Sequence, residues 1–205
     1  MRENIKSVLK KLGKQSELEK SEKIQVNHDE RMLTISNETG EFFNILLKAM
    51  KAKKILEVGM SVGFSTLWFA DAILANNGKI VTIEENQDKI TRAKKNFEEA
   101  GVSAQIKIQE GKALQILQKL ATSESEQQQF DFVFLDADKE NNIKYFDLVL
   151  PLVRVGGIIA TDNILYPEEF RPEMKKFTEY IKSKPNVQTM TLDLGNGEEI
   201  SIKTK

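Results

Sequence analysis

The sequence predicts an α/β protein built on a mostly parallel β-sheet with helices on both faces. Short apolar runs rich in β-branched residues alternate five times with longer segments of helical periodicity. Two further β-patterned segments then flank the turn sequence GNG at 195–197, as in a β-hairpin. Parallel strands need helical crossovers that cover both faces of a sheet, and the closing hairpin adds one antiparallel strand at an edge.

The elements are expected in a regular order along the chain. Residues 1–13 form an amphipathic helix with an apolar face of Ile5, Val8, Leu9 and Leu12, and residues 36–51 form a helix that covers the sheet. Strands are predicted at 53–58, 79–84, 104–110, 130–136, 156–163, 187–194 and 198–204. Helices are predicted at 65–75, 88–101, 112–121, 142–153 and 171–183, and the polar stretch 122–129 is a solvated loop.

Composition limits the class of protein. The 205 residues carry a net charge of −1, which gives no electrostatic footprint for nucleic acid or an anionic membrane, and the chain has no cysteine. The N-terminus lacks the apolar core of a signal peptide, and Glu57 and Asp71 interrupt the apolar stretch 55–75. We therefore expect a cytoplasmic protein with one domain, 1–205, in which 1–34 is a helical extension. That first helix packs on its own domain or on a partner subunit, with a membrane surface as the alternative.

A glycine-containing loop, LEVGMSVGFST at 56–66, joins the first strand to its helix. Gly59 and Gly63 allow a close backbone approach, but Ser61 breaks the G-x-G-x-x-G pattern of a dinucleotide site. Glu84 ends the second strand, where a carboxylate accepts hydrogen bonds from both hydroxyls of a ribose. Together with the loop 110–113, these features predict an adenosine ligand without phosphates, such as S-adenosylmethionine. The alternative is that the acids are solvent-facing strand ends.

A second cluster follows the strand in FDFVFLDADKEN, 130–141. Asp136 ends this strand, and Asp162 and Asn163 end the next one. Carboxylate and amide oxygens without His or Cys select Mg²⁺, or Mn²⁺ or Ca²⁺, rather than Zn²⁺. Lys139 lies three residues beyond Asp136 and is a candidate general base, because a neighbouring divalent cation disfavours its ammonium form. The alternative is a solvated loop that begins a helix.

Four segments of the chain resemble the cation-dependent class I O-methyltransferases, which include the catechol and caffeoyl-CoA families. These segments are ILEVGMSVGFST, FDFVFLDADKEN, GGIIATDN and LDLGNGEEISIK. The resemblance runs from about residue 35 to the C-terminus. It implies a Rossmann-like class I methyltransferase fold with strand order 3-2-1-4-5-7-6, strand seven antiparallel, and a homodimer. It implies Asp136, Asp162 and Asn163 as metal ligands and Lys139 as the base. It implies cofactor contacts from Ile35, Glu57, Gly59, Met60, Ser65, Glu84, Gly111, Ala113, Asp136, Asp138 and Tyr145.

The sequence departs from the plant enzymes in two regions. The loop after Asn163, ILYPEEFRPEM, is shorter and has Pro167 where they have a polar residue. The segment before residue 30 has no clear counterpart of their substrate-binding lysine. The catalytic core therefore carries over, whereas the acyl-CoA substrate does not. Tyr166 and Phe170 are candidates to line a pocket for a planar ring, and the lone histidine, His28, is expected to be a surface residue.

The sequence thus predicts a Mg²⁺- and S-adenosylmethionine-dependent O-methyltransferase acting on a vicinal hydroxyl of a small catechol-like acceptor. Three other functions stay open. A methyltransferase acting on another acceptor such as tRNA is disfavoured by the absence of a basic excess. A cofactor-binding protein without catalysis is disfavoured by the intact acid and lysine set. A nucleotide-dependent reductase is disfavoured by the broken glycine fingerprint.

Overall fold

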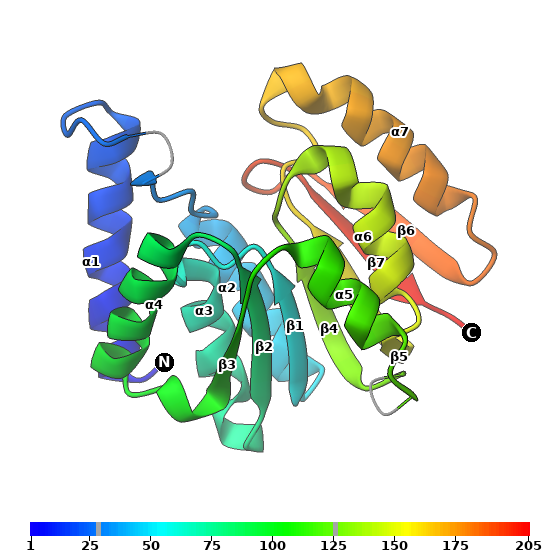
Figure 1. The fold of residues 1–205 in the computed structure, drawn as a ribbon, viewed down its shortest axis with the longest axis horizontal. Helices are drawn as coiled ribbons and strands as arrows, with labels where there is room; N and C mark the ends of the chain where they lie inside the picture. The colour runs from blue at the N-terminus through cyan, green and yellow to red at the C-terminus, as the bar shows by residue number, and fades with distance from the viewer. Residues whose placement is uncertain (28–29, 125–126) are drawn as a thin grey trace.

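A seven-stranded sheet separates two layers of helices in the computed structural model, which describes residues 1–27, 30–124 and 127–205 (Figure 1). The strand order is β3-β2-β1-β4-β5-β7-β6, with β7 antiparallel to both of its neighbours, as the family resemblance predicts. His28 and part of the 122–129 loop lie outside the described residues.

The strands and helices have the following bounds. The strands are β1 Lys54–Val58, β2 Lys79–Glu84, β3 Ile106–Glu110, β4 Phe130–Leu135, β5 Val153–Thr161, β6 Val187–Leu192 and β7 Glu198–Lys203. The α-helices are α1 Glu3–Lys20, α2 Asn37–Ala49, α3 Phe64–Ile73, α4 Gln87–Ala100, α5 Ala113–Ala121, α6 Asn142–Val149 and α7 Arg171–Lys182. Short 3₁₀ turns occur at Leu74–Asn76, Ser103–Gln105, Lys139–Asn141 and Glu168–Phe170.

Four boundaries and one strand position differ clearly from the prediction. The helix α6 ends at Val149, because Pro151 cannot continue a helix, and β5 begins at Val153 rather than at 156. The strand β3 begins two residues late, after a 3₁₀ turn. The N-terminal helix extends to Lys20. The antiparallel strand β7 lies between β5 and β6, so the hairpin's first strand, not the antiparallel one, forms the edge.

Alternate strand residues face opposite helical layers. Ile55, Phe132 and Phe134 pack with the helices α1 to α4, whereas Val133 and Leu135 pack with α5, α6 and α7. This explains why the strands read as continuous apolar runs, since both faces are buried. The sheet is thereby held rigid on both sides, and its strand ends are fixed relative to one another.

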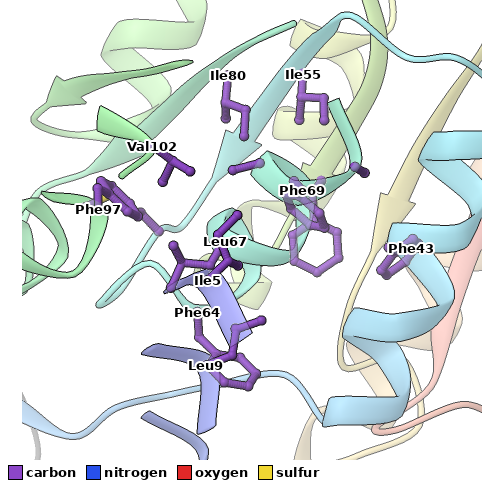
Figure 2. Close-up of a cluster of buried hydrophobic side chains, with 14 of the residues drawn as sticks. Ile5, Leu9, Phe43, Ile55, Phe64, Leu67, Phe69, Ile80, Phe97 and Val102 are labelled. Carbon is purple, nitrogen blue, oxygen red and sulfur yellow. The ribbon is translucent and has the colours of Figure 1, made fainter. Parts of the chain in front are cut away.

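The helix α1 is part of the first layer. Its predicted apolar face is buried, and Ile5 and Leu9 point toward Phe64 and Leu67 of α3 (Figure 2). The same cluster includes Phe97 of α4, so this face packs on the chain itself. No helix in the described ranges is long and apolar enough to cross a membrane.

Candidate functional site

Four parallel strands bring their carboxyl ends to one edge of the sheet. Val58 of β1 pairs with Ile83 of β2 and with Leu135 of β4, and Leu135 in turn pairs with Thr161 of β5. The residues that follow these positions are Gly59, Glu84, Asp136 and Asp162, so strand register alone aligns them along this edge. Ligands of open α/β sheets bind outside this edge, which makes it the candidate site.

The glycine loop is packed tightly against the strand ends. Gly59 has a φ of 96°, and a methyl group on it would overlap the carbonyl oxygen of Asp136. Gly63 has a φ of 85°, and a methyl group there would overlap the ring of Phe97. Only glycine combines this backbone conformation with this approach. The loop therefore has one shape, held between β1 and β4.

Glu57 lies beneath that loop and is fully buried. Its carboxylate accepts hydrogen bonds from the hydroxyls of Ser65, Thr66 and Thr82, each at 2.6 Å. Burial raises the pKa of Glu57 above its ordinary value, and the three hydroxyl donors act in the opposite direction. Glu57 and Ser65 thus satisfy each other and link β1, β2 and α3.

Glu84 is fixed by backbone groups at the end of β2. Its Oε2 accepts a hydrogen bond from the amide of Ser61 at 2.8 Å, and its Oε1 accepts from the amides of Glu85 and Asn86 at 3.0 Å each. The amide of Gly111 donates to the carbonyl of Glu84 at 2.8 Å, which brings the third-strand loop beside it. Ser61 Oγ is buried and has no hydrogen-bond partner within the described chain. This leaves a polar group that a ligand can satisfy.

Asp136, Asp162 and Lys139 form the second half of the site. Lys139 Nζ donates to Asp136 Oδ1 at 3.2 Å, and the Lys139 and Asp136 side chains are 11% and 20% exposed. Burial raises the pKa of Asp136 to about 7, with Lys139 opposing this shift and Asp162 adding to it. Burial also raises the pKa of Asp162, again against the effect of Lys139. The site therefore holds more buried acid than its lysine balances.

The neighbouring strand end presents Asp162 and Asn163 in a constrained turn. The amide of Asp162 donates to the carbonyl of Leu135 at 3.1 Å, and the amide of Asn163 donates to Asp162 Oδ1 at 2.6 Å. Asn163 has a φ of 66°, a left-handed conformation that asparagine adopts more readily than most residues. Strain of this kind is concentrated at functional sites.

Glu198 is a third acid of this site, which the sequence reasoning missed. It begins β7 and is fully buried, and its electrostatic neighbours are Asp162, Asp136 and Lys139. Burial, followed by the charge of Asp162, raises its pKa well above the ordinary range. A signal existed in the sequence, because the start of an antiparallel strand lies at the same edge as the ends of its parallel neighbours.

The donor set fits a hard divalent cation. Two carboxylates, of which Asp162 is buried and Asp136 is half-buried, and one amide oxygen are the ligand types that Mg²⁺ prefers. A cation would relieve the repulsion between the carboxylates. Three or more His, Cys, Asp or Glu side chains with metal-site spacing do not occur together in the described residues. Any cation site at this edge must therefore use the amide of Asn163 or water alongside the two aspartates.

The other predicted site residues are distributed around this edge. Tyr145 is buried and its hydroxyl donates to Asp138, and burial together with Asp138 raises the pKa of Tyr145 above its ordinary value. Ala113 begins α5 directly after the Gly111 loop. Met60 and Ile35 are buried in the core between the sheet and α1 to α4. The predicted cofactor contact of Ile35 stays a prediction.

A hollow of about 660 Å³ lies between the loop after β5 and the β6–β7 turn, lined by Leu165, Tyr166, Arg171, Asp193, Gly195 and Asn196. Its two walls are joined by hydrogen bonds from the amides of Ile164, Leu165 and Tyr166 to the carbonyls of residues 196–197. One wall continues from Asn163 and the other leads into Glu198. Tyr166 lines this hollow, whereas Phe170 packs against the core cluster that includes Met174 of α7. Their predicted role toward a planar ring stays a prediction.

Comparison with known proteins identifies the family. The family model described as O-methyltransferase matches residues 9–204. The chain belongs to the O-methyltransferase family. Caffeoyl-CoA O-methyltransferase 5 of Nicotiana tabacum is 31% identical over 189 residues, covering 85% of this chain and 78% of the tobacco protein.

Solved O-methyltransferases share the fold over the whole chain. The enzyme of Bacillus cereus, solved in complex with SAH, superposes with a TM-score of 0.79 at 27% identity and covers 100% of this chain and 92% of its own. TomG of Streptomyces achromogenes, solved in complex with SAM, gives a TM-score of 0.80 at 25% identity and covers 100% and 91%. These likenesses extend over α1 as well as the sheet, so the O-methyltransferase fold includes the N-terminal helix here.

Proposed function

We propose that this O-methyltransferase transfers the methyl group of S-adenosylmethionine to one hydroxyl of a vicinal pair on a small aromatic acceptor, with a divalent cation in the site. The observation that carries the proposal is the grouping of Asp136, Asp162, Asn163 and Lys139 beside the glycine loop at one sheet edge. The complexes of the Bacillus and Streptomyces relatives with SAH and SAM support the choice of methyl donor.

The donor site is proposed to lie over the first three strand ends. Glu84 is held by three amides in an orientation that leaves it the natural partner for ribose hydroxyls, and the free hydroxyl of Ser61 lies in the same loop. Gly59, Met60, Gly111 and Ala113 form the backbone walls, and Asp138 with Tyr145 closes the side near α6. Glu57 and Ser65 support the loop from below rather than facing solvent. The bound donor supplies an electrophilic methyl group.

The cation site is proposed to comprise Asp136, Asp162 and Asn163. Mg²⁺ suits this oxygen set, with Mn²⁺ or Ca²⁺ as substitutes. A cation held by these residues would supply Lewis acidity, which would favour loss of a proton from a hydroxyl of the acceptor. The excess of buried carboxylate around Lys139 supports this assignment, because positive charge at this edge is in deficit.

Lys139 is proposed as the general base. Its ammonium is paired with Asp136, and its side chain is only 11% exposed, so it is directed into the site rather than into solvent. As the neutral amine, after loss of its own proton, it takes the hydroxyl proton. The acceptor oxygen then attacks the methyl carbon in line, and the C–S bond breaks to leave S-adenosylhomocysteine. Fixed positioning of the reactants by the rigid strand ends supplies much of the remaining rate enhancement.

The hollow beside Asn163 and Glu198 is proposed as the acceptor pocket. Tyr166 offers a ring for stacking, and Arg171 and Asn196 offer polar contacts at its rim. The test compares labelled methyl transfer to catechols with transfer to matched monophenols. Transfer to catechols alone supports the vicinal acceptor, and equal transfer to both contradicts it. Activity on tRNA in the same assay would favour the rival acceptor class.

We also propose a homodimer formed by a single-domain chain, as the family resemblance implies. The apolar face of α1 is used within its own chain, so it is a poor candidate for the dimer contact. Met190 on the edge strand β6 and Ile202 on its neighbour β7 are exposed apolar side chains and are better candidates. Sedimentation velocity measures the state directly, and a monomer at micromolar concentration contradicts the proposal.

A further inference from the structure

Two consecutive buried glutamates begin β7, and their surroundings differ. Glu199 pairs with Thr161 in the sheet, and its carboxylate accepts hydrogen bonds from the hydroxyls of Thr189 at 2.6 Å and Thr191 at 2.5 Å. Glu198 is equally buried, yet no amide, hydroxyl or ammonium among residues 1–27, 30–124 and 127–205 donates to its Oε1 or Oε2, and its side-chain contact is with the carboxyl group of Asp162. Burial of an acid without such partners costs stability, so the fold alone does not account for Glu198.

The groups that face Glu198 come from three strand ends. Asp162 of the β5 end is its first electrostatic neighbour, Asp136 of the β4 end is the next, and Lys139 provides the opposing positive charge. Lys139 is already paired with Asp136, and Lys20 of α1 contributes positive charge to Asp162. Three carboxyl groups therefore meet where positive charge is insufficient, and one of them, Glu198, has only another acid as its side-chain partner in the described residues.

We propose that Glu198 sets how tightly this site holds a divalent cation, as a positioning residue that adds a third negative charge next to Asp162. The inference rests on the proposed function, because it assumes a cation at Asp136, Asp162 and Asn163. Glu198 acts through charge and through its contact with Asp162 and not as a direct ligand, since no three acids of the described chain have direct-ligand spacing. Outer carboxylates of this kind contribute about 10- to 100-fold to metal affinity.

The charge of Glu198 should affect cation affinity and the stability of the cation-free protein differently. Without a cation, burial and crowding disfavour the charged forms of the three acids, so replacing Glu198 with an uncharged amide of the same size should cost little stability. With a cation bound, the same substitution removes the attraction between the cation and the Glu198 carboxylate. Glu198→Gln should therefore weaken cation binding without lowering the stability of the cation-free protein, whereas a residue needed only for packing would lower stability.

The test titrates EDTA-stripped full-length protein with Mn²⁺, followed by electron paramagnetic resonance of the free ion, for the wild type, Glu198→Gln and Glu199→Gln. Melting temperatures are measured in EDTA for the same three proteins. We expect Glu198→Gln to weaken Mn²⁺ binding by about 10- to 100-fold with an unchanged or higher melting temperature. Glu199→Gln should keep the Mn²⁺ affinity within about twofold and lower the melting temperature, because its threonine partners lose a charged acceptor.

Other results overturn the inference in distinguishable ways. Wild-type affinity in Glu198→Gln contradicts the role of Glu198 and leaves the proposed function intact. If Glu198→Gln weakens Mn²⁺ binding and also lowers the melting temperature in EDTA, Glu198 has a structural role and the inference is contradicted. A wild-type protein that binds no Mn²⁺ removes the proposed cation site itself, and the inference with it.

Discussion

Lys139 Nζ lies 3.2 Å from Asp136 Oδ1, three residues away across a 3₁₀ turn, and the pair is mostly shielded from water. The lysine thus balances one carboxylate of a site that has more acid than base. Under the proposed function, a divalent cation held here would balance the carboxylates in place of the lysine, so that Lys139 could lose its own proton and serve as a base in the neutral amine form. Three predictions concern the two halves of this site, and a fourth concerns the helix that supports it.

Replacing the proposed base should remove catalysis without removing the fold. Lys139→Met is expected to lower kcat by about 100- to 10,000-fold, the usual contribution of a general base, with donor affinity unchanged. Lys144→Met is the matched control, because Lys144 is an exposed lysine of α6 whose ammonium donates a hydrogen bond to Asn141 Oδ1 at 3.0 Å. Steady-state kinetics measure both variants. Unchanged kcat in Lys139→Met would exclude the lysine as base.

The cation-free protein should lose stability as pH rises through the neutral range. The pKa of Asp136 is raised by burial from 3.8 to about 7, so the folded state keeps a proton that the unfolded chain has released. Its stabilising contribution is complete below about pH 4 and is lost as pH rises toward 7. Asp162 and Glu198 act in the same direction.

Melting temperatures in EDTA between pH 5 and 8 check this dependence. Asp136→Asn should flatten the decline, and saturating Mg²⁺ should remove it in the wild type, because the bound cation favours the ionised carboxylates. A wild-type melting temperature that rises steadily across this range in EDTA would show that Asp136 is ionised throughout.

Glu84 should determine affinity for the methyl donor. Glu84→Gln removes charge from a carboxylate that accepts three amide hydrogen bonds and replaces one oxygen with a donor group. We expect a loss of about 10- to 100-fold in S-adenosylhomocysteine affinity, from one or more charged hydrogen bonds of about 1.5–3 kcal/mol. Glu85→Gln is the control, since Glu85 is the exposed adjacent residue. Calorimetric titration that gives equal affinities for both variants would remove Glu84 from the donor site.

The N-terminal helix should unfold together with the rest of the chain. Ile5 is fully buried against α3 and α4, so Ile5→Ala should cost about 2–5 kcal/mol of unfolding free energy. Lys6→Ala, on the exposed face, should change it by less than about 0.5 kcal/mol. Urea unfolding followed by circular dichroism and tryptophan fluorescence should give one coincident transition. Two separated transitions would show that residues 1–34 are a separate unit.

The parts of the fold that sequence predicted are those in which local pattern and burial agree. The strands at 53–58 and 79–84 and the helix stop at Gly101 follow directly from apolar runs and from a left-handed residue at a helix end. The end of α6 was predicted wrongly. Apolar residues continue past Pro151 and suggested a longer helix, but the proline ends it earlier. The position of β7 followed from family resemblance, since a hairpin pattern does not say which of its strands joins the sheet first.

The candidate site was predictable where residues follow parallel strands. Asp136 and Asp162 were brought together by a register that the α/β pattern already implies. Glu198 was missed because it enters from an antiparallel strand, distant in sequence from the others. The surroundings of Glu57 were likewise not predictable, because its three hydroxyl partners come from α3 and β2, and no local pattern links them.

The most direct test of the cation-assisted mechanism is methyl transfer from labelled S-adenosylmethionine to a panel of vicinal diphenols, measured with Mg²⁺ and again with EDTA. We predict that EDTA abolishes transfer and that added Mg²⁺ or Mn²⁺ restores it, because Asp136, Asp162 and Asn163 act on the acceptor only through a cation. Transfer that persists at the same rate in EDTA would contradict the role assigned to these three residues.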